Sequence, residues 1–166
     1  HNFFTEYFAV QPDGKILLAG SYQIGHVLTS GVRLNADGSL DNSFQLQNAN
    51  RPANHVGQQP DGKIIFGGTF YRYGSGESHP GLVRLNSNGT VDNTFTGSVS
   101  YPDGGVNAIE QQPDGKVLVG GLFQRANGQP RGNLVRFNTD GTLDKTFNIG
   151  IGTAGTFDNY ISDIAL

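Results

Sequence analysis

One unit of about 50 residues is written three times in this chain of 166 residues, and the repetition constrains the fold more than any other feature. The string Gln-Pro-Asp-Gly-Lys stands at 11–15, 59–63 and 112–116. A second string follows each copy, RLNADGSLDNSF at 33–44, RLNSNGTVDNTF at 84–95 and RFNTDGTLDKTF at 136–147. Repeats of roughly 20–50 residues are typical of solenoids and propellers, in which neighbouring units bury one another's faces.

Each unit predicts four short strands. The first precedes the Pro-Asp-Gly turn, as at 106–111, and the second is the apolar run after Lys, at 16–20, 64–68 and 117–121. The third surrounds the Arg-Leu-Asn or Arg-Phe-Asn triplet, and the fourth ends on Phe44, Phe95 or Phe147. Pro presets φ in the turn and Gly supplies a left-handed position. The turn residues expected to do this are Asp13, Gly14, Asp61, Gly62, Asp114 and Gly115.

Four strands per unit predict an all-β fold, a β-propeller of three four-stranded blades plus one extra strand. The blades are expected at about 5–52, 53–104 and 105–158, with the extra first strand at 159–166, where NYISDIAL aligns with 106–111. Because propellers use about 4–8 blades, we expect the ring to be incomplete in this chain. Other copies, or the rest of a longer chain, are expected to complete it. The start on His1 in place of Met is consistent with an excerpt or a processed product.

At these two strings the chain resembles the delta-60 repeat, a bacterial β-propeller repeat found mainly in large secreted or surface proteins. The resemblance extends over nearly the whole chain. It implies a propeller in an extracellular or cell-surface setting, and it implies no catalytic residue.

The composition argues against several classes of function. A net charge of −3 and a pI near 5.7 disfavour nucleic acid and anionic membrane surfaces as partners. The absence of Cys removes disulfides, thiolate nucleophiles and zinc–thiolate sites. No run of apolar residues approaches the length of about 20 that a membrane helix needs.

The Asn-x-Asp/Asn-Gly turns raise the possibility of calcium, because oxygen-bearing side chains recur there. They stand at Asn35, Asp37, Asp41, Asn86, Asn88, Asp92, Asn138, Asp140 and Asp144. A helix–loop–helix calcium site has Gly at its sixth position and Glu at its twelfth, whereas here Gly comes fourth. We therefore expect hairpin turns, with no metal and no cofactor, and keep calcium as the alternative.

An Arg and an Asp recur eight residues apart in every unit. The pairs are Arg33 and Asp41, Arg84 and Asp92, and Arg136 and Asp144. Across a hairpin this spacing predicts an Arg–carboxylate contact that belongs to the framework. A ring of arginines that binds an anion is the alternative.

The loops between second and third strands, at 22–31, 71–81 and 124–132, differ among the units. Aromatic and cationic side chains of the kind that anchor ligands gather in two of them, and loops are also where sequence drifts harmlessly. The candidate ligand-binding residues are Tyr71, Arg72, Tyr73, His79, Arg125 and Arg131.

The leading hypothesis for function is a non-enzymatic extracellular or cell-surface structural or adhesion module that self-associates through blade edges. One alternative is a glycan- or peptide-binding propeller that uses the variable loops, and another is a hydrolase with its site in the central channel. The catalytic signatures of paired carboxylates, a nucleophile elbow and clustered histidines are not found in the sequence.

Overall fold

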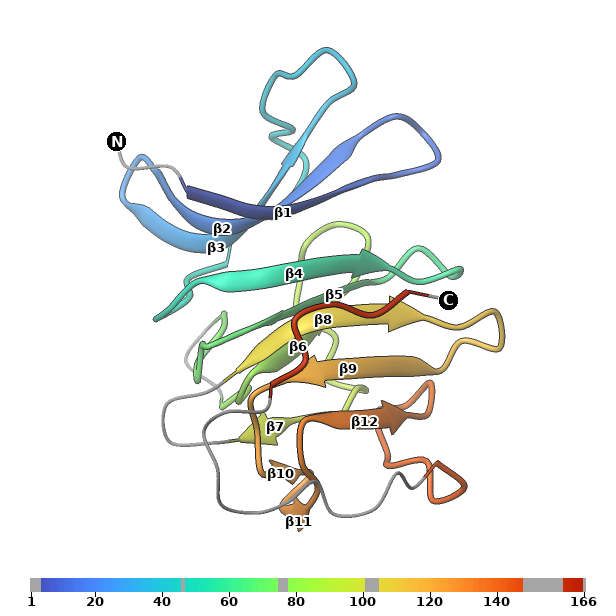
Figure 1. Cartoon of the computed structure of the whole chain (residues 1–166). Coiled ribbons are helices and arrows are strands. Elements are labelled where there is room, and N and C mark those ends of the chain that lie inside the picture. The colour runs from blue at the N-terminus through green and yellow to red at the C-terminus, as the bar shows by residue number, and fades with distance from the viewer. Residues whose placement is uncertain (1–3, 46, 75–77, 101–104, 148–159, 166) are drawn as a thin grey trace.

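The computed structural model describes residues 4–45, 47–74, 78–100, 105–147 and 160–165, and all regular structure in them is β (Figure 1). Each repeat unit forms an antiparallel sheet whose second strand lies in the middle. The sheets are β1 (Phe4–Val10), β2 (Ile16–Ile24) and β3 (Val27–Leu34); β4 (Ala53–Gln58), β5 (Ile64–Gly68) and β6 (Leu82–Leu85); and β8 (Val106–Gln111), β9 (Val117–Gly121) and β12 (Leu134–Phe137). Among the described residues, no helix is long and apolar enough to cross a membrane.

The Pro-Asp-Gly turns join first and second strands in each unit as their sequence predicts. Gly14, Gly62 and Gly115 have φ values of 83°, 83° and 81°, a left-handed conformation that favours glycine. In the first unit the Gly14 N–H donates to the Gln11 carbonyl over 2.9 Å, and the Lys15 N–H donates to Asp13 Oδ1 over 3.1 Å. The other two units repeat both bonds.

The expected fourth strand is reduced to one bridge in each unit, so the sheets have three strands and not four. The bridges join Leu34 to Leu40, Leu85 to Val91 and Phe137 to Leu143. Directly after the first bridge, the Phe44 N–H donates to the Asp41 carbonyl over 3.1 Å. This turn leads the chain away from the sheet before a ladder forms.

The segment that links one unit to the next pairs with the far end of the following hairpin. Ala49 bridges to Tyr73, at the end of the second hairpin. In the same place of the third unit, β7 (Val99–Ser100) pairs with β10 (Arg125–Ala126), which pairs with β11 (Gln129–Pro130). This small sheet is the fourth in the described residues.

Successive sheets stack face to face, with the second strand of one unit against the first strand of the next. A Cβ placed on Gly67 would lie 2.8 Å from Cδ1 of Ile109, and one on Gly120 would lie 3.0 Å from Cδ1 of Ile164. The first unit has Ala19 at this position, in a buried cluster with Ala53. Two such clusters, one between each pair of sheets, form the core.

Residues 160–165 lie where the extra first strand is expected, but they form no strand ladder. The Ile161 N–H donates to the Gly121 carbonyl over 3.3 Å, and Asn107 Nδ2 donates to the Ile161 carbonyl over 3.2 Å. Positions 159 and 166 of the expected strand lie outside the described residues.

Candidate functional site

Each unit builds the same group of one Asp, one Arg and one Lys, here called the ion triad. The backbone places the pair, because the N–H of Asp41 donates to the carbonyl of Arg33 over 2.9 Å across the end of the hairpin. Arg33 Nε then lies 2.8 Å from Asp41 Oδ2, and Lys15 Nζ reaches the same oxygen over 2.8 Å. The second triad is Lys63, Arg84 and Asp92, and the third is Lys116, Arg136 and Asp144, all with distances of 2.8–2.9 Å.

The carboxylates of the triads are held in their charged form. The hydrogen bonds from Lys15 and Ser43 hold the pKa of Asp41 well below its ordinary value, and those from Lys116 and Thr146 do the same for Asp144. At Asp92 burial raises the pKa, but Lys63 and Thr94 together outweigh it and the pKa is lowered. A carboxylate so held is a poor proton donor near neutral pH, so the Asp of each triad is not suited to act as a general acid.

The triad arginine also ties its unit to the next one. Arg33 Nη1 donates to the Ser87 carbonyl over 2.6 Å, and Arg84 Nη1 donates to the Thr139 carbonyl. Each guanidinium lies 4.7 Å from the centroid of a Phe ring, Phe44 for the first and Phe95 for the second. These contacts occupy the arginine donors that an anion would need, so the arrangement favours a framework role over an anion ring.

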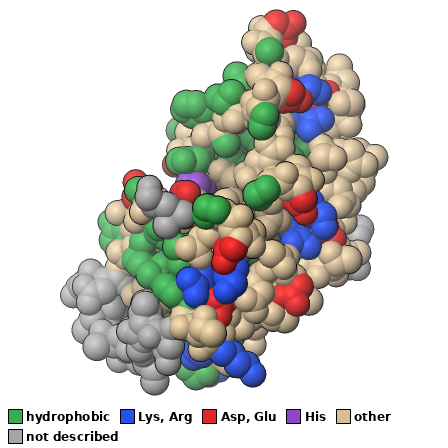
Figure 2. All heavy atoms as spheres, turned by 90° about the vertical axis from the view of Figure 1, so that its right-hand side faces the viewer, with side chains coloured by type: hydrophobic (Ala, Val, Ile, Leu, Met, Phe, Trp, Pro, Cys, Tyr) green, Lys and Arg blue, Asp and Glu red, His purple; other side chains and the backbone are tan. Residues whose placement is uncertain are grey.

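The third arginine differs from the other two in its surroundings. Arg136 keeps its contacts with Asp144 and with the Phe147 ring, and its Nη1 lies 3.5 Å from Gln112 Oε1. Its side chain is 21% exposed, against 9% for Arg33 and 5% for Arg84. Among the described residues no carbonyl of a following unit is bonded to it. On the molecular face in Figure 2, most basic side chains lie next to acidic ones, at several separate places. No large area of this face carries charge of a single sign.

In the Asn-x-Asp/Asn-Gly turns, the side-chain oxygens accept hydrogen bonds from other residues of the same turn. Asp37 Oδ1 accepts from both the backbone N–H and the hydroxyl of Ser39, over 2.9 and 2.6 Å. Asn35 turns its amide nitrogen, not its oxygen, toward the Ser39 hydroxyl. In the part of the chain that the structure describes, no three His, Asp or Glu side chains are placed to hold a metal ion. This geometry is that of a hairpin turn.

Tyr73, a candidate ligand-binding residue, lies in the core and is removed from that set. Only 1% of it is exposed, and its ring packs on Phe70 with centroids 5.3 Å apart. Burial raises the pKa of its hydroxyl to about 12. In a regular strand Tyr71 and Tyr73 would lie on the same face and have similar exposure. Residues 71–73 do not form a regular strand, so Tyr73 is buried while Tyr71 is half-buried, and the sequence alone could not show this difference.

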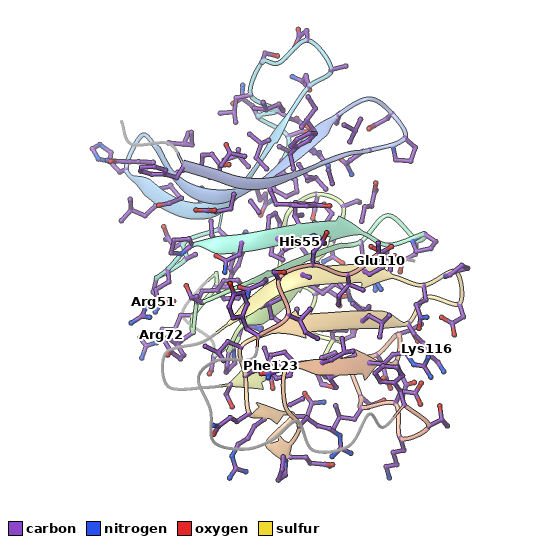
Figure 3. The ribbon with its side chains drawn as sticks, viewed as in Figure 1. Arg51, His55, Arg72, Glu110, Lys116 and Phe123 are labelled. Atoms are coloured by element: carbon purple, nitrogen blue, oxygen red, sulfur yellow. The ribbon has the colours of Figure 1, made fainter. Side chains whose placement is uncertain are left out.

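The other candidates lie at the surface or near it. Arg72 is exposed, while Tyr71 and His79 are half-buried and joined by a 2.9 Å bond from the His79 N–H to the Tyr71 carbonyl. Arg125 and Arg131 each donate to a carbonyl of their own loop, that of Gly128 and that of Pro130. Figure 3 shows Arg51 and Arg72 at the end of the strands opposite to Lys116, so Arg72 lies far from the third triad.

Sequence reasoning missed three members of this framework. It did not pair the triad lysines with an Asp, although their recurrence in every unit was a signal. It did not place a Phe ring under each arginine. It also missed Asn54, which stands at a register shift of β4 and donates from Nδ2 to the Val106 carbonyl of the next unit over 3.1 Å.

The residues of the turns and triads are also the residues that a known family shares. The family model described as "Domain of unknown function (DUF5122) beta-propeller" matches residues 11–44, 59–95 and 112–147. The chain belongs to this family. The DUF5122 match starts at each Gln-Pro-Asp-Gly-Lys string and ends on the Phe beneath each triad arginine, in agreement with a delta-60-type repeat. No curated protein matches the chain, and no solved structure does.

Proposed function

We propose that this DUF5122 chain is a non-enzymatic structural or adhesion module whose three blades join further units of the same kind. The extracellular or cell-surface setting rests on the resemblance to the delta-60 repeat. The joining step rests on one observation, the open apolar face of the first sheet.

The open face consists of Phe8, Ile16, Leu18 and Leu34. Phe8 is 61% exposed and the other three are half-buried. The residues at the same positions of the second and third units are at most 3% exposed, because the preceding sheet covers them: Val56, Ile64, Phe66 and Leu85, and Ile109, Val117, Val119 and Phe137. The open face therefore has the side chains of a blade interface and lacks the neighbour.

The covered interfaces indicate what fits the open face. Ile109 packs at Gly67 and Ile164 packs at Gly120, in each case a small residue of the preceding unit's second strand. Phe8 stands at the position of Ile109, so its partner is a strand with a small residue at the matching point. In the isolated chain the matching point is Gly120 of a second copy, where Phe8 takes the place of Ile164. A head-to-tail contact then closes into a ring or grows into a filament.

Light scattering on the isolated chain tests this proposal. We expect a mass that is a multiple of 17.7 kDa. Phe8→Asp places a charge on the open face and should give a monomer with an unchanged circular dichroism spectrum. Phe4→Asp is the matched control, because Phe4 is 65% exposed on the same strand but the register shift between Thr5 and Tyr7 turns it to the other side of the sheet. A monomeric parent chain, or equal effects of the two variants, would contradict the proposal.

A further inference from the structure

A groove of about 480 Å³ opens where the first strands of three successive units end. The last residues of β1, β4 and β8, which are Val10, Gln58 and Gln111, line it, together with the turn prolines Pro12, Pro60 and Pro113. Its volume lies within the range of small-molecule sites. The repeat therefore brings equivalent positions of three units to one place.

The chemistry of this groove is neutral. None of the described residues that line it carries a charge, since they are Gln, Pro, Gly, Ala and Val. The cations of the adjoining turns, such as Lys15 and Lys116, are engaged by the carboxylates of the triads. A charged ligand would thus lose its hydration without gaining a counter-charge.

The side-chain amide of Gln111 lacks hydrogen-bond partners among the described residues. Both its Nε2 and its Oε1 are enclosed, and neither has a partner in the described part of the chain. Its side chain lies against Gly57 of the neighbouring strand, where a Cβ would come within 3.9 Å of Nε2. A buried polar group without a partner destabilises a fold, and the terminal torsion of Gln is soft enough to turn the amide into the groove.

The three walls differ in character. Gln58 and Gln111 present amides, each with donors and an acceptor, while the equivalent position in the first unit is Val10, which is 65% exposed. A pyranose has the matching asymmetry, with hydroxyls that both donate and accept at its rim and C–H groups on its faces. We propose that this groove binds a neutral saccharide, with Gln58 and Gln111 bonding its hydroxyls and Val10 and the prolines contacting its apolar face.

Side-chain amide resonances in NMR spectra of the whole chain provide the test. The probes are neutral di- and trisaccharides of glucose, galactose, mannose and N-acetylglucosamine at 10 mM. At least one should shift the Gln58 and Gln111 amide signals, and Gln111→Leu should weaken its binding about tenfold or more. Gln124→Leu is the control, because Gln124 is exposed in another loop and should leave binding unchanged.

The outcomes decide the matter in either direction. Absence of shifts with every neutral sugar, or binding that Gln111→Leu leaves intact, overturns the inference. Preferential binding of a neutral extended peptide, or of a sulfated or uronic-acid oligosaccharide, overturns it as well. Gln111 does not belong to the open face, so Gln111→Leu should leave the mass of the assembly unchanged. The mass therefore tests the proposed function independently of saccharide binding.

Discussion

The ring of Tyr7 in the first unit stacks on the ring of His55 in the second, with centroids 3.7 Å apart and planes inclined by 25°. His55 is 6% exposed, and its Nδ1 is enclosed without a hydrogen-bond partner among the described residues. Burial lowers the pKa of His55 to about 4, and the charge of Asp163 opposes this only in part. The stacked imidazole is therefore neutral, and its protonation opposes the contact between two units.

The first prediction is that acid weakens the fold through His55 well above the range in which carboxylates titrate. The unfolded imidazole binds a proton near pH 6.5 and the folded one only near pH 4. The unfolded state thus takes up more protons in this window, and the free energy of unfolding falls as the pH drops from 6.5 to 4, by up to about 3 kcal/mol.

Urea denaturation at pH 7.5, 6 and 5 measures this effect. The His55→Phe variant retains a ring for Tyr7 and should lose most of the pH dependence in this window. The lowered pKa values of Asp41 and Asp144 act in the same sense but at lower pH, because their contribution is complete above the ordinary carboxyl pKa and is lost only below it. Equal slopes for the parent and His55→Phe would contradict the assignment.

The second prediction concerns the arginine contact between units. Arg84→Lys keeps the charge near Asp92 but loses the bond to the Thr139 carbonyl and the fit over Phe95. We expect a loss of about 2 kcal/mol in unfolding free energy, since hydrogen bonds from charged groups contribute about 1.5–3 kcal/mol.

The chain contains its own control for this change. Arg136 makes the same contacts within its unit but has no bonded carbonyl of a following unit among the described residues. Arg136→Lys should therefore cost clearly less than Arg84→Lys in the same urea experiment. If the two losses are equal, the contact with Thr139 contributes nothing.

The third prediction follows from the interface of the second and third units, where a residue without a side chain, Gly67, faces larger side chains of the next unit. A Cβ on Gly67 would overlap Val106 and lie 2.8 Å from Ile109 Cδ1. Gly67→Ala should cost about 1–3 kcal/mol through overpacking. The first interface has Ala19 and Ala53 at these two positions, so adding Val106→Ala should recover part of the loss. Thermal melts of both variants and of Val106→Ala alone complete the cycle, and additive effects would show that the two positions are independent.

The turns and the pairing of each Arg with its Asp follow directly from the sequence, because both depend on contacts within a few residues. Gly14 has the positive φ that its turn requires, and Arg33 meets Asp41 across one hairpin end. The missing fourth strand depends on a finer balance. One bridge at Leu40 forms, and then the side chain of Asp41 satisfies the N–H of Ser43 over 2.9 Å, which replaces the ladder.

Contacts between units were out of reach of sequence reasoning. The bond from Arg33 to the Ser87 carbonyl joins residues 54 positions apart. Because every residue has a backbone carbonyl, the identity of residue 87 does not indicate that it accepts this bond. The groove has the same origin, because Val10, Gln58 and Gln111 converge only when the sheets stack.

The fourth prediction separates the two tyrosines that the sequence placed together as ligand-binding residues. Tyr73→Ala removes a ring that packs against Phe66 and Phe70 and should cost about 3–5 kcal/mol in unfolding free energy. Tyr71→Ala removes a half-buried ring that lies 5.3 Å from the Arg51 guanidinium, and should cost about 1 kcal/mol or less. Urea denaturation followed by circular dichroism measures both. A small loss for Tyr73→Ala would return that residue to the surface and to the set of candidate ligand contacts.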